Sequence, residues 1–407
     1  MIAADISWML VATVLVLLMT PAVGFFYGGM VSRRNAVSTT FQSFICIGVV
    51  GLLWAICGYS LVFSGDTEGF IGNFDYAFLK DVGIEPNADY GSTIPHVLFM
   101  LFQATFAVIT PALISGSMAG RIRFKAWFLM MPLWSLFVYV PVAHWVWGPN
   151  GWIGQMGGLD FAGGLVVHMT SGFAAVVAAL MLGNRAKFKP DEHGFSATMV
   201  LLGTALLWVG WFGFNAGSAL AANGLAAYAA GTTFFAAVTA MTVWVLCDWV
   251  FTGRPSAVGS AVGAVAGLVA VTPAAGFVTM QSAIIIGAVA AILCYGAVRL
   301  VKQKFKTDDT VDVFACHGVG GTVGTILTAV FATTSINPDG ADGLLYGSAD
   351  LLYANVIGAV VVVAYTLVMT FIILKVISFM TPLRVSEKEE QTGLDLSQHG
   401  EKVFSLN

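Results

Sequence analysis

Long runs of apolar residues recur along the whole chain of 407 residues and are separated by short polar segments. A helix needs about 20 apolar residues to cross the hydrocarbon core of a membrane, and eleven runs meet this measure. We predict membrane-spanning helices at 7–31, 36–64, 94–118, 124–144, 161–182, 197–217, 227–251, 256–274, 279–299, 311–334 and 351–379. The first run lacks the basic flank and small-residue cleavage site of a signal peptide, so it is predicted to be a true span.

The composition supports this pattern and excludes a soluble globular protein. Hydrophobic residues make up 58% of the chain, charged residues only 10%, and the mean hydropathy is +0.85. Soluble domains carry about 25% charged residues, so too few are present here to cover a water-facing surface. The polar character rises only after the last run. We therefore predict a transmembrane domain over residues 1–380 and a cytoplasmic C-terminal tail over residues 381–407.

The distribution of basic residues predicts the orientation in the membrane. If the N-terminus lies outside, seventeen of the eighteen Lys and Arg residues fall on the cytoplasmic side, and only Lys80 falls outside. Basic residues gather on the cytoplasmic side of membrane proteins. The predicted outer loops are acidic instead. The chain is thus predicted to be a multi-pass protein of the cell (inner) membrane, with its N-terminus outside and its C-terminus in the cytoplasm.

Two histidines lie deep within predicted spans. His168 follows Asp160, at the outer end of span five, by eight residues, and His317 follows Asp312, at the inner end of span ten, by five. The strings around them, DFAGGLVVHMTSG and DVFACHGVGGTVG, resemble each other, although the two spans run in opposite directions. This predicts two inverted five-helix halves plus a C-terminal helix. Ionisable groups at this depth usually mark a pathway, and the plainer alternative is a hydrogen bond to a neighbouring carbonyl.

Other candidate chemistry is sparse. The five cysteines lie in apolar runs without metal-ligand spacing and are predicted to be packing residues. No nucleophile elbow or catalytic carboxylate pair occurs, so neither an enzyme nor a bound metal or cofactor is predicted. The remaining histidines are predicted to lie near outer helix ends or in cytoplasmic segments, with no role in a pore: His96, His144, His193 and His399.

Several longer motifs occur in a fixed order. They are GFFYGGMVSRRN (24–35), FQATFAVITPALISGSMAGRIRF (102–124), YVPVAHWVWG (139–148), LDFAGGLVVHMTSG (159–172), LLWVGWFGFNAGSA (206–219), DVFACHGVGGTVGT (312–325) and RVSEKEEQTGLDLSQHGE (384–401). Through these motifs the chain resembles the ammonium transporter (Amt/Mep/Rh) family along essentially its full length. It looks most similar to the bacterial and archaeal ammonium transporters.

The resemblance implies roles for individual residues. Phe106, Trp147 and Ser218 match the family's outer cation-recruitment site, Asp160 the buried acid beneath it, Phe106 and Phe214 the stacked rings that close the pore, and His168 and His317 the paired pore histidines. Phe26, Gln103, Trp211 and Thr272 match pore-lining or nearby positions. The loop GPNGWIGQMGG after Trp147 is one residue longer than in the best-known bacterial members. It makes Trp152 a second candidate for the aromatic wall.

These residue types suit ammonium, which differs from potassium in donating hydrogen bonds and in being able to lose a proton. An aromatic platform attracts either cation, but a hydroxyl acceptor favours ammonium. The resemblance implies transport of ammonium and methylammonium across the lipid bilayer by a homotrimer. It also implies docking of a PII-type regulatory protein near the tail and the basic loops 121–125 and 185–189, and no nucleic acid. The alternatives are an ammonium sensor built on the same fold and an Rh-type gas channel.

Overall fold

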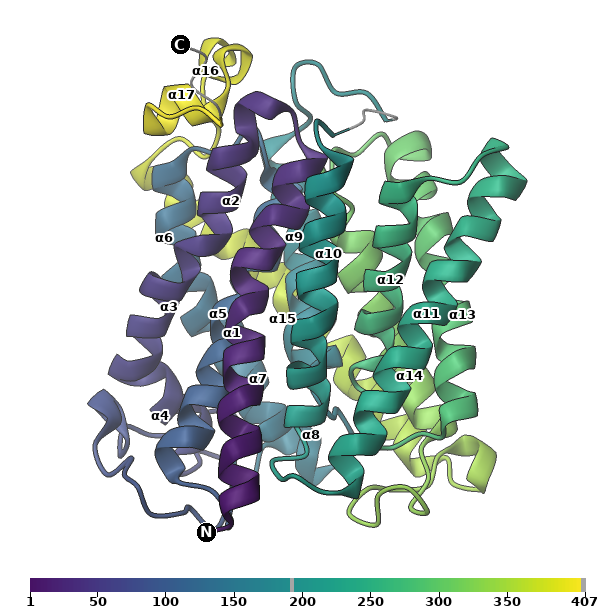
Figure 1. The fold of residues 1–407 in the computed structure, drawn as a ribbon. Helices are drawn as coiled ribbons and strands as arrows, with labels where there is room; N and C mark the ends of the chain where they lie inside the picture. Colours follow the sequence, from purple (N-terminus) through teal and green to yellow (C-terminus); the bar gives the residue numbers. More distant parts are fainter. Residues whose placement is uncertain (191–193, 404–407) are drawn as a thin grey trace.

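The protein is a bundle of long helices, seen in a computed structural model that describes residues 1–190 and 194–403 (Figure 1). His193 and residues 404–407 lie outside the described residues. Within the described ranges the backbone forms isolated bridges but no strand. Ten helical segments are long and apolar enough to cross a membrane: Ala3–Met30, Arg33–Phe63, His96–Met118, Phe124–Gln155, Gly164–Leu182, Ala197–Ala216, Gly224–Thr252, Met280–Lys304, Phe314–Phe331 and Asp350–Met380. The predicted all-α polytopic fold is confirmed.

Most spans are built from more than one helical piece. The unbroken helices are α1 (Ala3–Met30), α5 (His96–Met118), α11 (Gly224–Thr252), α12 (Ala257–Val271) and α15 (Asp350–Met380). The composite spans are η1 (Arg33–Asn35), α2 (Ala36–Phe44), α3 (Cys46–Leu53), η2 (Trp54–Gly58) and α4 (Tyr59–Phe63); α6 (Phe124–Trp134), η4 (Ser135–Tyr139), α7 (Val140–Trp147) and α8 (Trp152–Gln155); η5 (Gly164–Met169) and α9 (Thr170–Leu182); α10 (Ala197–Trp211) and η6 (Phe212–Ala216); α13 (Met280–Arg299) and η7 (Leu300–Lys304); and η8 (Phe314–Val319) and α14 (Gly320–Phe331). Segments η2 and η4–η8 are π-helical, a rare geometry that is frequent at functional sites.

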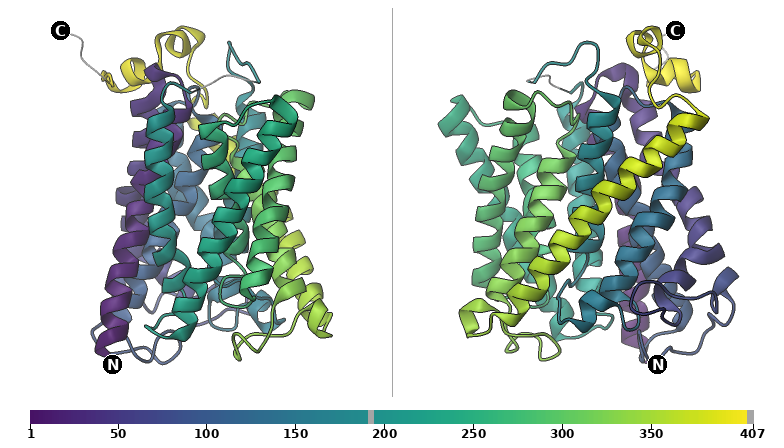
Figure 2. Two further views of the ribbon diagram at one scale, coloured as in Figure 1. Left: turned by 45° about the vertical axis from the view of Figure 1, so that its right-hand side comes forward. Right: turned by 180° about the vertical axis from the view of Figure 1, so that it is seen from behind.

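The eleventh predicted span, 256–274, corresponds to α12. This helix has 15 residues, so it falls short of the length that a membrane crossing usually needs. It begins at a Ser256 cap and packs against both α11 and α13. The start of α1 and the end of α15 lie at opposite ends of the bundle, which an odd number of crossings produces (Figures 1 and 2). The count of eleven spans stays a prediction that this arrangement favours.

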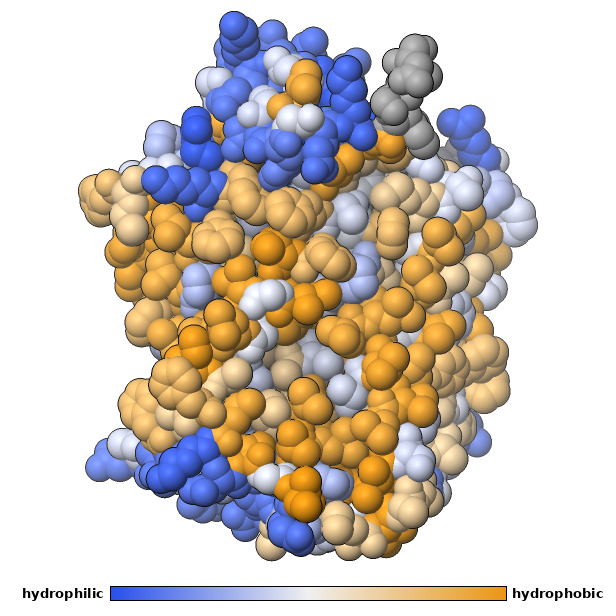
Figure 3. Space-filling model, turned by 60° about the vertical axis from the view of Figure 1, so that its left-hand side comes forward, coloured by the Kyte–Doolittle hydropathy of each residue, from blue (hydrophilic) through white to orange (hydrophobic). Residues whose placement is uncertain are grey.

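The surface of the bundle suits a lipid environment. A broad apolar belt covers the face shown in Figure 3, with hydrophilic residues gathered at its two ends. Large apolar side chains that would be buried in a soluble protein are exposed here, among them Leu10, Val14, Leu52 and Phe379. Behind the bundle, α15 runs diagonally across the other helices (Figure 2). We call the end that carries the C-terminus the tail side, and the opposite end the N-terminal side.

The two spans that carry His168 and His317 begin at opposite ends of the bundle. Each starts with a six-residue π-helical segment, η5 or η8, that contains the histidine and then continues as an ordinary α-helix. Helix α9 ends at the tail side, where the Leu182 carbonyl accepts a hydrogen bond from Arg384. Segment η8 instead starts near that side. The predicted inverted relation of the two spans is thus visible in their direction and in their shared local geometry.

Residues 381–403 of the polar tail are folded and dock on the transmembrane helices. Its short helices are α16 (Glu387–Thr392), which starts with a capping box, and α17 (Leu394–His399). The Asp395 carboxylate accepts hydrogen bonds from the backbone N–H groups of Val37 and Ser38, at the first turn of α2, with N–O distances of 3.1 and 2.8 Å. A carboxylate at this position satisfies helix amides that would otherwise lack partners. The tail thereby completes the start of a membrane helix.

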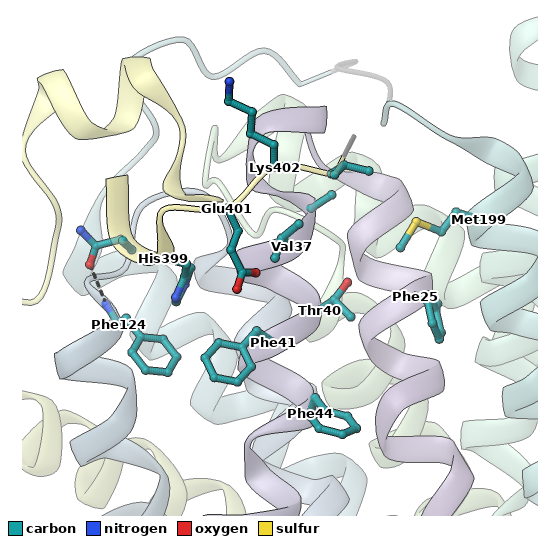
Figure 4. Close-up of a pocket in the computed structure, with 13 residues that line it drawn as sticks. Phe25, Val37, Thr40, Phe41, Phe44, Phe124, Met199, His399, Glu401 and Lys402 are labelled. Carbon is teal, nitrogen blue, oxygen red and sulfur yellow. Dashed lines mark hydrogen bonds between the residues drawn. The ribbon is translucent and has the colours of Figure 1, made fainter. Parts of the chain in front are cut away.

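Aromatic contacts fasten the end of α17. The ring of His399 lies edge-on to the rings of Phe41 and Phe124, with centroid distances of 5.3 and 4.9 Å (Figure 4). The Gln398 side chain accepts a hydrogen bond from the Phe124 backbone N–H. A groove of about 700 Å³ opens beside these contacts, between the tail and α1, α2 and α10. The end of α17 is therefore packed against α2 and α6.

Candidate functional site

A cavity of about 340 Å³, which we call the mouth cavity, opens at the N-terminal side and is lined by the predicted recruitment residues. Phe106, Trp147 and Ser218 all line it. The Trp147 indole N–H donates a hydrogen bond to the Asp160 carbonyl oxygen at 3.0 Å, which fixes the ring. The Ser218 hydroxyl donates to the Phe214 carbonyl at 2.8 Å. Because its hydrogen is used there, the Ser218 oxygen can act toward the cavity only as an acceptor.

The Asp160 carboxylate is held by the start of the span that carries His168. One oxygen accepts hydrogen bonds from the N–H groups of Gly163 and Gly164 at 2.8 and 2.6 Å, and the other from Leu165 and Val166 at 2.7 and 3.3 Å. The turn that aims these amides needs Gly163 at φ 124°. Asp160 thus caps this helix, and its charge acts on the cavity as an electrostatic field.

Two phenylalanine rings separate the mouth cavity, which Phe106 lines, from a narrower cavity, which Phe214 lines. The centroids of Phe106 and Phe214 are 4.3 Å apart and the ring planes are inclined by 36°. The resemblance predicts stacked rings, and the observed pair is close but tilted from parallel. Trp147 stands edge-on to Phe106 at 6.0 Å, so Phe106 belongs to the mouth and to the constriction. Both phenylalanines are almost fully buried.

The two histidines meet directly below this constriction. The Nδ1 atoms of His168 and His317 are 3.2 Å apart, a hydrogen-bond distance, and both rings are buried. The His168 ring lies roughly parallel to Phe214 and to Trp211, with centroid distances of 6.0 and 5.5 Å. Both histidines line a narrow cavity of about 20 Å³, together with Phe26 and the two aromatic residues. Each Nδ1 atom therefore contacts the other histidine and not a backbone carbonyl, which was the plainer alternative.

Small residues allow the two histidine-bearing helices to cross closely. A Cβ atom placed on Gly172 would lie 2.0 Å from the backbone nitrogen of Gly318, so any side chain at position 172 would push the two helices apart. Nearby, the Trp211 indole donates a hydrogen bond to the Thr272 hydroxyl at 2.9 Å. Thr272 therefore acts through Trp211, as a support for the ring on which His168 stacks. The crossing fixes the separation of the two histidines.

Comparison with known proteins identifies the family. Residues 7–404 match the sequence model described as the Ammonium Transporter Family. The chain belongs to this family. It is 48% identical to the ammonium transporter of Bacillus subtilis over 400 residues, with 98% of each chain covered. It is 44% identical to the ammonium transporter Amt1 of Archaeoglobus fulgidus, with 98% of this chain and 99% of that protein covered.

Solved structures of family members have the same fold. The Candida albicans Mep2 crystal structure superposes with a TM-score of 0.89 at 38% sequence identity, covering 95% of this chain and 87% of that one. A structure described as a Sensor Amt Protein gives a TM-score of 0.90 at 28% identity, covering 97% and 98%. Members of this family are transporters and not enzymes, in agreement with the sequence prediction.

The structure separates the two candidate indoles of this family member. Trp152 does not line the mouth cavity, and its ring packs beside that of Trp145 with the centroids 5.8 Å apart. Gln103 does line the cavity. His144, predicted to have no role in the pore, bridges the Val62 carbonyl at 2.7 Å and the Asp66 carboxylate at 3.1 Å, away from the mouth. Among the described residues no group of three side chains suited to hold a metal ion occurs.

Sequence reasoning overlooked Tyr27. Its ring lines the histidine cavity, and its hydroxyl donates a hydrogen bond to the Leu113 carbonyl at 3.1 Å. The residue is buried and lies in the motif GFFYGGM, of which the resemblance assigned only Phe26 to the pore. A tyrosine among glycines near a helix end usually indicates an interfacial ring. Only the spatial arrangement shows that this one faces the histidine pair.

Proposed function

We propose that this chain transports ammonium by recruiting the cation at the mouth, removing a proton there and conducting ammonia through the apolar constriction, while the proton crosses by way of the histidines. The observation that carries the proposal is that the mouth cavity, the phenylalanine constriction and the histidine pair follow one another without a gap. Phe106 belongs to the mouth and to the constriction, and His168 packs against Phe214 directly beneath it. The relatives that are 44–48% identical are named ammonium transporters, which favours transport over a sensor or a gas channel.

The mouth is suited to attract an ammonium ion. The faces of Trp147 and Phe106 offer cation–π attraction of about 0.5–2 kcal/mol, depending on how far the ion is desolvated. The Ser218 oxygen accepts a hydrogen bond that potassium cannot donate. The capped Asp160 carboxylate adds negative potential from below. Together these groups concentrate cations and prefer the one that carries N–H bonds.

The constriction then separates ammonia from its proton. A cation between the Phe106 and Phe214 rings would lose its hydration shell without gaining a comparable set of ligands, at a cost of several kcal/mol. Neutral ammonia loses much less. Below the rings, the histidine pair presents both donor and acceptor nitrogens, so it can hold ammonia and pass a proton between the rings. The proton and the ammonia molecule thereby pass the constriction separately.

This proposal predicts selectivity against potassium. Proteoliposomes containing the protein should take up ammonium and methylammonium but pass potassium no faster than protein-free liposomes do. In Ser218→Ala, loss of the acceptor should weaken the apparent affinity for ammonium about fivefold, which corresponds to about 1 kcal/mol. Ser378→Ala, at an exposed hydroxyl near the end of α15, is the matched control and should behave as wild type. Potassium flux comparable to the ammonium flux would refute the proposal.

The location and orientation of the transporter form a second part of the proposal. We assign the tail side to the cytoplasm and the N-terminal side, with the mouth cavity, to the exterior of the cell (inner) membrane. The assignment rests on the seventeen Lys and Arg residues that the predicted topology places on the tail side. Ammonium is then captured outside and released inside the cell.

We further propose that the protein forms a homotrimer and that a PII-type regulator docks on its tail side. The ordered tail and the neighbouring loops provide a firm surface for docking. Of the predicted basic loops, Lys125, Lys187 and Lys189 are exposed, whereas Arg121 is buried in contacts within the chain. The lysines, and not Arg121, are therefore the positive charges available to a partner.

Native mass spectrometry tests both statements in one preparation. Purified protein should give the mass of three copies. Addition of a purified PII-type protein should add mass in a complex that dissociates as the salt concentration rises, because exposed charges are screened. Lys125→Glu with Lys187→Glu should weaken the complex, and Lys80→Glu, on the opposite side, is the matched control. A monomeric protein would contradict the trimer, and a complex insensitive to the inner lysines would contradict the docking surface.

A further inference from the structure

Asp309 is a buried carboxylate with a free oxygen. It lies in the connection between η7 and η8, at the tail side, and is 1% exposed. Its Oδ2 atom accepts a hydrogen bond from the backbone N–H of Phe314 at 2.7 Å, so it caps the span that carries His317. Its Oδ1 atom has no hydrogen-bond partner among the described residues. Such a group is costly to bury, so its retention calls for a functional reason.

The position of Asp309 repeats that of Asp160 in the other half of the chain. Asp160 precedes His168 by eight residues, and Asp309 precedes His317 by eight. Each carboxylate caps the π-helical segment that holds the histidine. The two carboxylates differ in how many of their oxygens accept hydrogen bonds. Both oxygens of Asp160 are taken up by four amides, whereas one oxygen of Asp309 is left open.

The charged neighbours of Asp309 are already paired with each other. Asp308 binds Arg185 through both oxygens at 2.8 and 3.0 Å, with Arg121 at 3.9 Å. Asp312 binds the Lys302 ammonium at 2.8 Å. Arg121 and Lys302 attract Asp309 only from a distance, and Asp312 repels its charge. Asp309 is thus the acid of this cluster that is not committed to an ion pair.

Asp309 lies close enough to two residues near the histidine pair to act on them electrostatically. It interacts electrostatically with the Tyr27 hydroxyl and the Cys316 thiol, and Tyr27 lines the histidine cavity. Val311, two residues after Asp309, reaches the same place, because a Cβ atom on Gly116 would touch both the Val311 side chain and the Tyr27 ring. The connection that carries Asp309 therefore packs beside Tyr27, a residue that lines the cavity.

The environment also sets the acidity of this group. Burial, together with the nearby Asp312 carboxylate, raises the pKa of the Asp309 carboxyl to about 7. A carboxyl group with this pKa is half protonated near neutral pH, so it can both take up and release a proton there.

We propose that Asp309 is the group at which the transported proton rejoins ammonia on the cytoplasmic side. This step rests on the proposed function. The Asp309 carboxylate takes the proton that leaves the histidine pair. When ammonia arrives, the carboxyl O–H bond breaks, a new N–H bond forms, and ammonium departs. Asp309 is left as a carboxylate, ready for the next cycle.

The test compares ammonium currents of reconstituted wild type and variants on solid-supported membranes, with the same pH on both sides, from about pH 6 to pH 8. Wild-type current should rise through an inflection near pH 7, because Asp309 must be deprotonated to accept a proton. Asp309→Asn and Asp309→Ser keep a capping atom for Phe314 and remove the titration. Each should lower the current about tenfold or more and abolish the inflection. Asp309→Glu should retain an inflection.

Asp248→Asn is the matched control, since Asp248 is another buried acid that accepts a backbone hydrogen bond, from Ser256, away from the histidines. Its current should have the wild-type pH profile. Folded Asp309→Asn with wild-type current and inflection would overturn this inference, while the proposed transport would stand. Absence of any ammonium current in wild type would instead refute the transport proposal. If neither uncharged variant folds, a wild-type current without an inflection near pH 7 overturns the inference.

Discussion

Replacing His168 or His317 by alanine should abolish the ammonium-driven current, or make the pore permeable to potassium, in a protein that still folds. Each substitution removes one side of the 3.2 Å contact between the two Nδ1 atoms and leaves the remaining histidine without a partner to exchange a proton with. The space vacated by the ring lies in a narrow cavity that can then admit water or a cation. Current should fall at least about tenfold where proton transfer is lost.

The deciding experiment pairs thermal stability in detergent with currents for ammonium and potassium. Glutamate or aspartate at either position retains a titratable group and should keep part of the current. His96→Ala serves as the control, because His96 is a buried histidine that contacts Tyr59 away from the pair. Folded alanine variants with wild-type current and selectivity would refute a transport role for the pair. Variants that only lose stability would support the purely structural interpretation.

Asp160→Ala should cost more stability than any other single substitution in the pore. Four backbone N–H groups would lose the acceptor that they share, in a site buried from water. Unsatisfied buried donors cost about 1–3 kcal/mol each, and the turn can rearrange to recover part of this. We expect a net loss on the order of 3–5 kcal/mol together with the loss of transport.

Thermal melting in detergent and ammonium uptake measure the two effects. Asp160→Asn keeps one acceptor oxygen and should be less destabilised, although transport should fall because the negative potential is gone. Asp5→Asn is a suitable comparison, since Asp5 accepts a single backbone hydrogen bond, from Ala222, and should cost about 1 kcal/mol. An Asp160→Ala protein that melts like wild type would show that the amides find other partners, and would contradict the capping role.

Much of this architecture could be predicted from the sequence because membrane spans are defined by length and polarity. The run 197–217 became the span Ala197–Ala216, and 351–379 became α15, without any tertiary information. The depth of His168 followed from its distance to Asp160. The roles assigned to the pore residues came from the family resemblance, and they remain predictions that the geometry favours.

What the sequence could not reveal depends on local backbone geometry. The π-helical segments η5 and η8 have no composition of their own, since they differ from an α-helix only in that each hydrogen bond spans one residue more. The capping role of Asp309 was not predicted either. Asp312 lies at the inner end of span ten and pairs with Lys302, while the carboxylate that caps this span is that of Asp309, three residues earlier. Which of two nearby acids caps a helix depends on which one forms an ion pair, and that is known only from the structure.

The contact between like nitrogen atoms has a kinetic consequence. Two Nδ1 atoms at hydrogen-bond distance share one hydrogen, so the two neutral rings must be opposite tautomers: one is protonated at Nδ1 and the other at Nε2. A proton that enters on the outer ring, His168, and leaves from the inner ring, His317, converts each ring to its other tautomer. A second proton cannot follow in the same direction until the rings have exchanged their hydrogens back. The open pore should therefore show a maximum turnover, as a carrier does, set by the time that this pair takes to reset.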